Sequence, residues 1–131
     1  MAKIEDRPFD AGVAQARTKT DAELIEWWKQ RVALLAGIPS DVARAGAVLP
    51  QLRELARLPE PDRRRLIKSR MQAVIAAPRD QAAKLFAAVG LANAMDPALV
   101  KSDQQIADQL APEIPGAAEF RPEFIERREQ P

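Results

Sequence analysis

Apolar residues recur at helical spacing along most of the chain, in stretches that prolines and glycines separate. The clearest stretch lies near the middle, between Leu58 and Pro78. Pro61 suits the first turn of a helix, and Pro78 closes the segment because a proline disfavours helical geometry in the residue before it. One half of this helix surface is apolar and carries Leu66, Ile67, Met71, Val74 and Ile75. The pattern therefore predicts a central helix between these prolines.

A second helix is predicted from Thr20 to Gly37. Thr20 and Glu23 have the spacing of a capping box, and Gly37 is placed to end the helix in a left-handed conformation. Its core stripe consists of Leu24, Ile25, Trp28, Val32 and Leu35. Trp27 and Leu34 form a second apolar strip beside it. Either the N-terminal arm or another helix covers this strip, or it is a partner-binding face.

The next helix is predicted to begin at Ser40, which can cap it. Its apolar phase continues through Pro50 to residue 58, so one kinked helix and two short helices both fit the pattern. We expect a break, because Gly46 and Pro50 together weaken the middle of the segment.

Two further helices follow the central one. Asp80 is expected to cap an apolar helix that lies at the centre of the bundle. Asp96 and Pro97 resemble a cap followed by a first-turn proline, and Ser102 and Gln105 have the spacing of another capping box. The last helix is therefore predicted over about 103–110, and a turn at 97–101 can precede it.

These elements predict an all-α protein: a compact bundle of four to five short helices that covers residues 20–111. Residues 1–19 are expected to form an extended, flexible N-terminal arm that Phe9 can attach to the domain. Residues 112–131 are expected to form an extended acidic tail, broken by prolines, with a short amphipathic segment.

The composition excludes several kinds of chemistry. The 131 residues include no Cys and no His, which excludes disulfides, thiolate nucleophiles, Cys/His zinc sites and His-based catalysis. No glycine-rich phosphate loop is present, and no carboxylate is expected within an apolar helical stripe. We therefore expect a protein that is not an enzyme and needs no cofactor or metal.

The chain is also expected to be soluble and cytoplasmic, without a membrane partner. Its longest uncharged run, Leu85 to Met95, is too short to span a bilayer. Its first residues include acids where a signal peptide needs an apolar stretch.

The net charge of +1 is unevenly distributed. Residues 53–84 contain nine basic and four acidic side chains, and residues 95–131 contain four basic and eight acidic ones. Either the acidic end folds back onto the basic middle, or each region meets a different partner; solvated faces are the simplest interpretation.

Binding is the function that this pattern favours. The first hypothesis is a non-catalytic protein–protein interaction module or a small accessory subunit of a larger assembly. Its partner is another protein or a second copy of the chain. The predicted contacts are Trp27, Leu34, Phe120, Phe124 and Ile125.

The alternative is a nucleic-acid-binding protein whose basic central helix contacts phosphates, through Arg63, Arg64, Arg65, Lys68 and Arg70. No aromatic residue interleaves this cluster to stack on bases, and three successive arginines point about 100° apart on a helix. Arg63 and Arg70 fall inside the apolar arc. They either keep their guanidinium groups in water, pair with carboxylates of another segment, or hold an anion.

Residues 21–48 also have the outline of a helix-turn-helix. The second helix offers only Asp41 and Arg44 as polar groups for base edges, so a plain αα-corner is the favoured interpretation.

Overall fold

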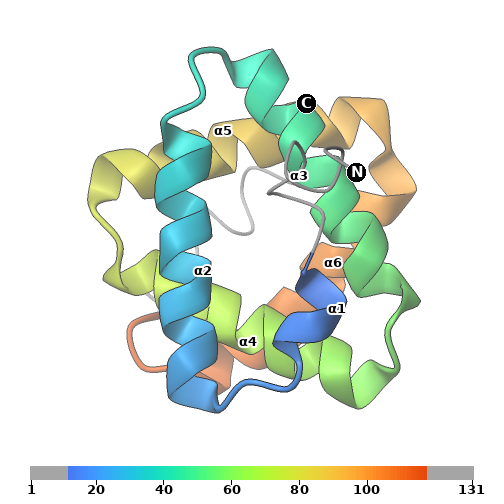
Figure 1. Cartoon of the computed structure of the whole chain (residues 1–131). Helices are drawn as coiled ribbons and strands as arrows, with labels where there is room; N and C mark the ends of the chain where they lie inside the picture. The colour runs from blue at the N-terminus through green and yellow to red at the C-terminus, as the bar shows by residue number, and fades with distance from the viewer. Residues whose placement is uncertain (1–11, 118–131) are drawn as a thin grey trace, which may run out of the picture.

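The computed structural model describes residues 12–117, in which every regular element is a helix (Figure 1). The helices in this part of the chain are α1 (Val13–Ala16), α2 (Asp21–Ala36), α3 (Asp41–Arg57), α4 (Glu60–Ala76), α5 (Arg79–Met95), α6 (Pro97–Leu110) and the 3-10 helix η2 (Ala111–Glu113). The predicted all-α bundle is confirmed. None of the described helices is long and apolar enough to cross a membrane.

The long helices pack in pairs across the bundle. In Figure 1, α2 and α3 lie on opposite sides, and α4 and α5 run between them at the two ends. The most extensive contacts join α2 to α4 and α3 to α5, while α6 packs against α3, α4 and α5. Segments that follow one another in the sequence are therefore not the main packing partners.

The core consists of three clusters of buried side chains. The first core cluster combines residues of α1, α2, α4 and α6 with Leu55 of α3, and it includes Trp28, which is 1% exposed. The second core cluster lies between α3 and α5 and includes Val48, Leu52 and Ala92. The third core cluster is small and contains Val32, Val74, Ala82 and Phe86. α5 buries four side chains, against seven in α3 and six in α4, and none of the four belongs to the first core cluster, so the expectation that α5 occupies the centre of the bundle is wrong.

The packed body is wider than the predicted 20–111. Val13 and Ala16 of α1 are buried in the first core cluster, and so are Ile114 and Ala117 beyond α6. α1 packs mainly against α3 and η2 packs against α6, which brings the segments before α2 and after α6 into the fold. Phe9 lies outside the described residues.

The capping box at the start of α2 is confirmed. The N–H of Glu23 donates to Thr20 Oγ1 at 3.2 Å, and the N–H of Thr20 donates to Glu23 Oε1 at 2.9 Å. The second bond stabilises the ionised carboxylate and lowers the pKa of Glu23. Ser40 caps α3 as expected, through the N–H of Ala43. Gly37 ends α2, as expected, but its φ is −78°, so the predicted left-handed conformation is wrong. Its N–H donates to carbonyls of the last turn of α2 in right-handed geometry.

The predicted break in the 41–58 segment is also wrong, because α3 is one helix that contains Pro50. The proline has no N–H for the carbonyl of Gly46, four residues earlier, and its ring crowds that position. Gly46 is exposed, so water can satisfy the carbonyl.

Two predicted helix starts are displaced. The predicted cap at Asp96 and first-turn proline at Pro97 are confirmed, because Asp96 Oδ1 accepts the N–H of Leu99 at 3.2 Å; α6 therefore begins at Pro97 rather than near residue 103. Ser102 therefore lies inside the helix and caps nothing. α5 begins at Arg79, with Pro78 as its cap residue, and Asp80 lies in its first turn without a capping bond.

Candidate functional site

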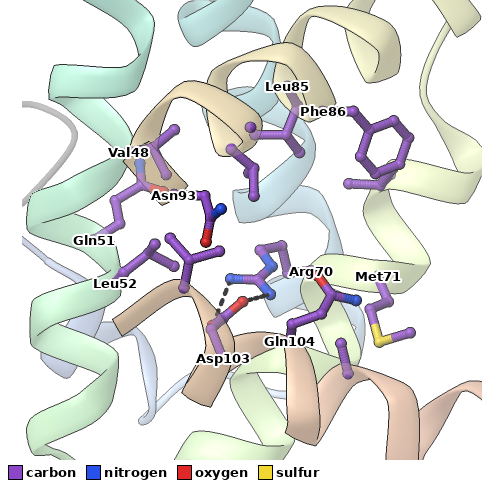
Figure 2. A pocket seen from close by; sticks show the side chains of 15 residues that line it. Val48, Gln51, Leu52, Arg70, Met71, Leu85, Phe86, Asn93, Asp103 and Gln104 are labelled. Atoms are coloured by element: carbon purple, nitrogen blue, oxygen red, sulfur yellow. Dashed lines mark hydrogen bonds and ion pairs between the residues drawn. The ribbon is translucent and has the colours of Figure 1, made fainter. Parts of the chain in front are cut away.

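A partly open cavity of about 80 Å³ lies between α3, α4, α5 and α6. We call it the central cavity. Most of its wall is apolar, with side chains that include Val48, Leu52, Met71, Leu85, Phe86 and Val89 (Figure 2). These residues belong to or pack against all three core clusters, so the cavity lies where the three clusters meet.

An ion pair forms the polar part of the wall. Arg70 Nη2 donates to Asp103 Oδ2 at 2.6 Å and Arg70 Nη1 donates to Asp103 Oδ1 at 3.2 Å. The two side chains are only 16% and 15% exposed. The guanidinium carbon also lies 6.0 Å from the centre of the Trp28 ring. Such a bidentate pair fixes both side chains in one orientation, and Figure 2 shows it facing the labelled apolar side chains.

Amide side chains complete the polar surface. Gln51 is buried on α3, and Gln104 of α6 donates from Nε2 to Asp108 Oδ1 at 3.2 Å. Asn93 and Gly90 of α5 are exposed at the rim. The cavity therefore has mostly apolar walls that include a buried amide and an ion pair, and it offers the exposed amide of Asn93 at its edge.

A second cavity of about 10 Å³ lies on the other side of Arg70, Gln51 and Leu85, which line both spaces. Its volume is close to the minimum that one water molecule needs. Trp28 also lines it, and the indole Nε1 is buried with no hydrogen-bond partner among the described residues.

The two residues of the predicted apolar strip have different surroundings. Trp27 is half-buried. The centres of the Trp27 and Trp28 rings lie 4.8 Å apart in an edge-on arrangement, and the guanidinium carbon of Arg31 lies 4.1 Å from the centre of the Trp27 ring. Gly12 also lies against Trp27 and Arg31, so the segment before α1 helps to cover this end of the strip. Leu34 is 55% exposed. Phe120, Phe124 and Ile125 lie outside the described residues.

Most of the basic cluster on α4 bonds other parts of the same chain. Arg65 Nε donates to Asp21 Oδ1 at 2.7 Å, and the same guanidinium bonds the carbonyls of Arg17 and Lys19. Arg64 Nη1 donates to Gln109 Oε1 at 2.8 Å. Arg70 is likewise bound to Asp103. Three of the five residues predicted to contact phosphate therefore bond other groups of the same chain.

The two arginines of the apolar arc differ. Arg70 pairs with a carboxylate of another helix, which is one of the predicted alternatives. Arg63 is half-buried, and its Nε has no hydrogen-bond partner among residues 12–117. Lys68, the remaining residue of the cluster, is half-buried.

The helix-turn-helix outline has no matching geometry. α2 packs mainly on α4 and α3 mainly on α5, with few contacts between α2 and α3. Arg44, which would have to reach base edges, is buried and bonds Asp41.

Four polar residues of the cavity are not among the predicted site residues: Gln51, Asn93, Asp103 and Gln104. Asp103 follows Val100 by three positions and precedes Ala107 by four, and all three line the cavity. The expectation that no carboxylate lies within an apolar stripe is therefore wrong for Asp103. The sequence contains a signal for this site, because Asp103 lies at helical spacing between the apolar residues Val100 and Ala107. The interpretation of Ser102 as a cap placed Asp103 at the helix start instead of inside the stripe.

The lining determines what the central cavity can do. Asp103 is its only carboxylate and is bound to Arg70, and no three His, Cys, Asp or Glu side chains among the described residues are grouped as a metal site requires. The surface is suited to holding an apolar group and bonding a polar group at the rim.

The sequence matches no protein-family model, and searches of curated proteins and of solved structures return no match to the chain. The function is therefore inferred from the central cavity and its surroundings.

Proposed function

We propose that the protein is a non-catalytic interaction module, or a small accessory subunit, that binds an apolar side chain of a partner protein in the central cavity. The supporting observation is the cavity itself, a partly open and mostly apolar space of about 80 Å³ with the exposed amide of Asn93 at its edge. An enclosed cavity that holds benzene measures about 150 Å³. The space here is thus suited to a branched aliphatic side chain or the leading edge of an aromatic ring.

Rim groups add specificity to this contact. Burying one large apolar side chain contributes about 1.5–3 kcal/mol, which is too little for a stable complex by itself. Asn93 can bond the backbone of a bound segment beside the opening, and the exposed Leu34 offers a further apolar contact on another part of the surface. The partner is another protein or a second copy of the chain.

The glycines Gly90 and Gly46 provide a matched pair of variants to test the proposal. Each lies inside a long helix, is exposed, and has no atom within 4 Å of the position that a Cβ would occupy. Only Gly90 lines the central cavity. Gly90→Leu should therefore obstruct the opening, whereas Gly46→Leu adds the same side chain elsewhere.

The measurement is affinity capture of the tagged full-length chain from lysate of its source organism, at two salt concentrations and with nuclease. We expect a defined protein to be retained by the wild type and by Gly46→Leu, and to fall at least about tenfold with Gly90→Leu, the equivalent of 1.4 kcal/mol. Equal capture by both variants would contradict the proposal. Recovery of nucleic acid that disappears steeply with salt would instead favour the basic-helix alternative.

A further inference from the structure

The described chain ends against the C-terminal part of α4, a helix whose residues Arg70, Met71 and Val74 line the central cavity. Ile114 and Ala117 are buried in the first core cluster, and a Cβ on Gly116 would lie 3.3 Å from Ile75 Cγ2. Ile75 follows Val74 in the sequence, and Val74 lines the cavity. Ile75 also packs against the third core cluster, which contains Phe86. The chain is therefore fixed at the C-terminal end of α4 when it enters residues 118–131.

The sequence beyond this point contains side chains of the kind that the cavity can accept. Residues 118–131 include three large apolar residues, Phe120, Phe124 and Ile125, among charged and polar ones. An extended chain spans at most about 3.3–3.6 Å per residue, so Phe120 can reach about 10 Å from Ala117 and Phe124 about 24 Å. One turn of α4 is about 5.4 Å long, and its cavity-lining residues occupy little more than one turn.

We propose that residues 118–125 of the same chain dock over the central cavity, with Phe120 or Phe124 inserted between α4 and α5. The short connection favours the segment of the same molecule, because a tether of a few residues gives an effective concentration in the millimolar range. The N-terminal segment is a poorer occupant of this cavity. It enters the described fold at Gly12, against Trp27 and Arg31, and Arg31 lines the smaller cavity rather than the central one.

The docking does not depend on the proposed function, but its consequence does. If a partner side chain uses the same cavity, it must displace residues 118–125, so the segment acts as a built-in competitor. Replacing both phenylalanines should then increase partner capture, while the docking itself is measured without any partner.

The methionines provide a test in the full-length chain. Met71 lines the central cavity and is 2% exposed, whereas Met95 is 49% exposed and does not line it. We would record methyl NMR spectra of the 13C-methionine-labelled protein with Phe120→Leu, Phe124→Leu and, as a control, Phe9→Leu. Removing a ring from the cavity should move the Met71 methyl peak and leave the Met95 peak in place.

Three outcomes would overturn the inference. In the first, neither Phe120→Leu nor Phe124→Leu moves the Met71 peak, and in the second, only Phe9→Leu moves it. In the third, the position of the Met71 peak changes on dilution, which would assign the occupant to a second copy of the chain. Gly90→Leu should reproduce the Met71 change caused by the phenylalanine variant, and Gly46→Leu should not. If the peak behaves as expected while partner capture fails, the docking stands and only the proposed function is lost.

Discussion

Among residues 12–117, Asp103 is the one carboxylate that lines the central cavity, and it stabilises the fold through its bond to Arg70. Both side chains have lost most of their hydration, so removing one charge leaves the other poorly solvated. Because some solvent access remains, we expect Asp103→Asn to lower the free energy of unfolding by about 2–3 kcal/mol, somewhat less than for a fully buried pair. Urea denaturation with an unchanged m-value would measure this loss.

Glu26→Gln is the control for that variant. Glu26 pairs with Lys29 at 3.9 Å in solvent, and its replacement should change stability by no more than about 0.5 kcal/mol. The double variant Arg70→Met/Asp103→Leu should recover most of the loss, since it leaves no unpaired charge. Similar losses from Asp103→Asn and Glu26→Gln would mean that the buried pair contributes little.

At the scale of single elements, α3 carries an unfavourable combination in its interior. Gly46 and Pro50 each lower helix stability, yet the helix is continuous because its buried face packs against α5. Gly46→Ala should raise the free energy of unfolding by about 1 kcal/mol, because the added methyl group meets no neighbour. For a domain of this size the melting temperature should rise by about 4 °C.

Gly12→Ala is the control for Gly46→Ala, because it should lower the stability of the protein instead of raising it. Gly12 has a φ of +96°, and a Cβ there would lie 3.2 Å from Arg31 Nη2, so alanine should destabilise the fold. A decrease in melting temperature with Gly46→Ala would show that the middle of α3 needs glycine for a reason other than propensity.

The elements that the sequence predicted well are those with local signals at both ends. Thr20 and Glu23 mark the start of α2, and Pro61 and Pro78 bracket α4. The wrong boundaries came from local signals that packing overrides: Pro50 does not break α3, and Ser102 does not start α6. Local capping and propensity terms are about 1 kcal/mol each, which contacts along a buried helix face can exceed.

The candidate site was less predictable because it combines distant segments. Helical spacing placed Arg70 inside an apolar arc and indicated a carboxylate as one possible partner. It could not choose Asp103, which is 33 residues away in the sequence and meets Arg70 only when α4 packs against α6. The cavity itself depends on four helices that no local pattern brings together.

At the scale of the whole molecule, part of the basic middle meets part of the acidic end inside the fold. Arg70 of α4 binds Asp103 of α6, as expected if the two regions associate within one chain. Arg65 adds a similar link from α4 to Asp21 and the start of α2. The uneven charge therefore contributes to holding the helices together, which leaves fewer arginines for an external polyanion.

The three core clusters are also linked, and this predicts how the molecule unfolds. Ile75 packs against the first and third clusters and Leu85 against the second and third, so no cluster has an independent boundary. We expect a single cooperative transition in urea. Tryptophan fluorescence, which reports on α2, and the methyl NMR peaks of Val48 and Leu52 should give the same midpoint.

An earlier midpoint for Val48 and Leu52 would contradict this expectation and separate the α3–α5 half from the rest. If the transitions coincide, any group bound in the central cavity must stabilise the whole bundle, because the cavity is lined from all three clusters. Replacing Phe120 and Phe124 by leucine should then lower both midpoints together. A change in only one probe would show that the occupant supports a single cluster.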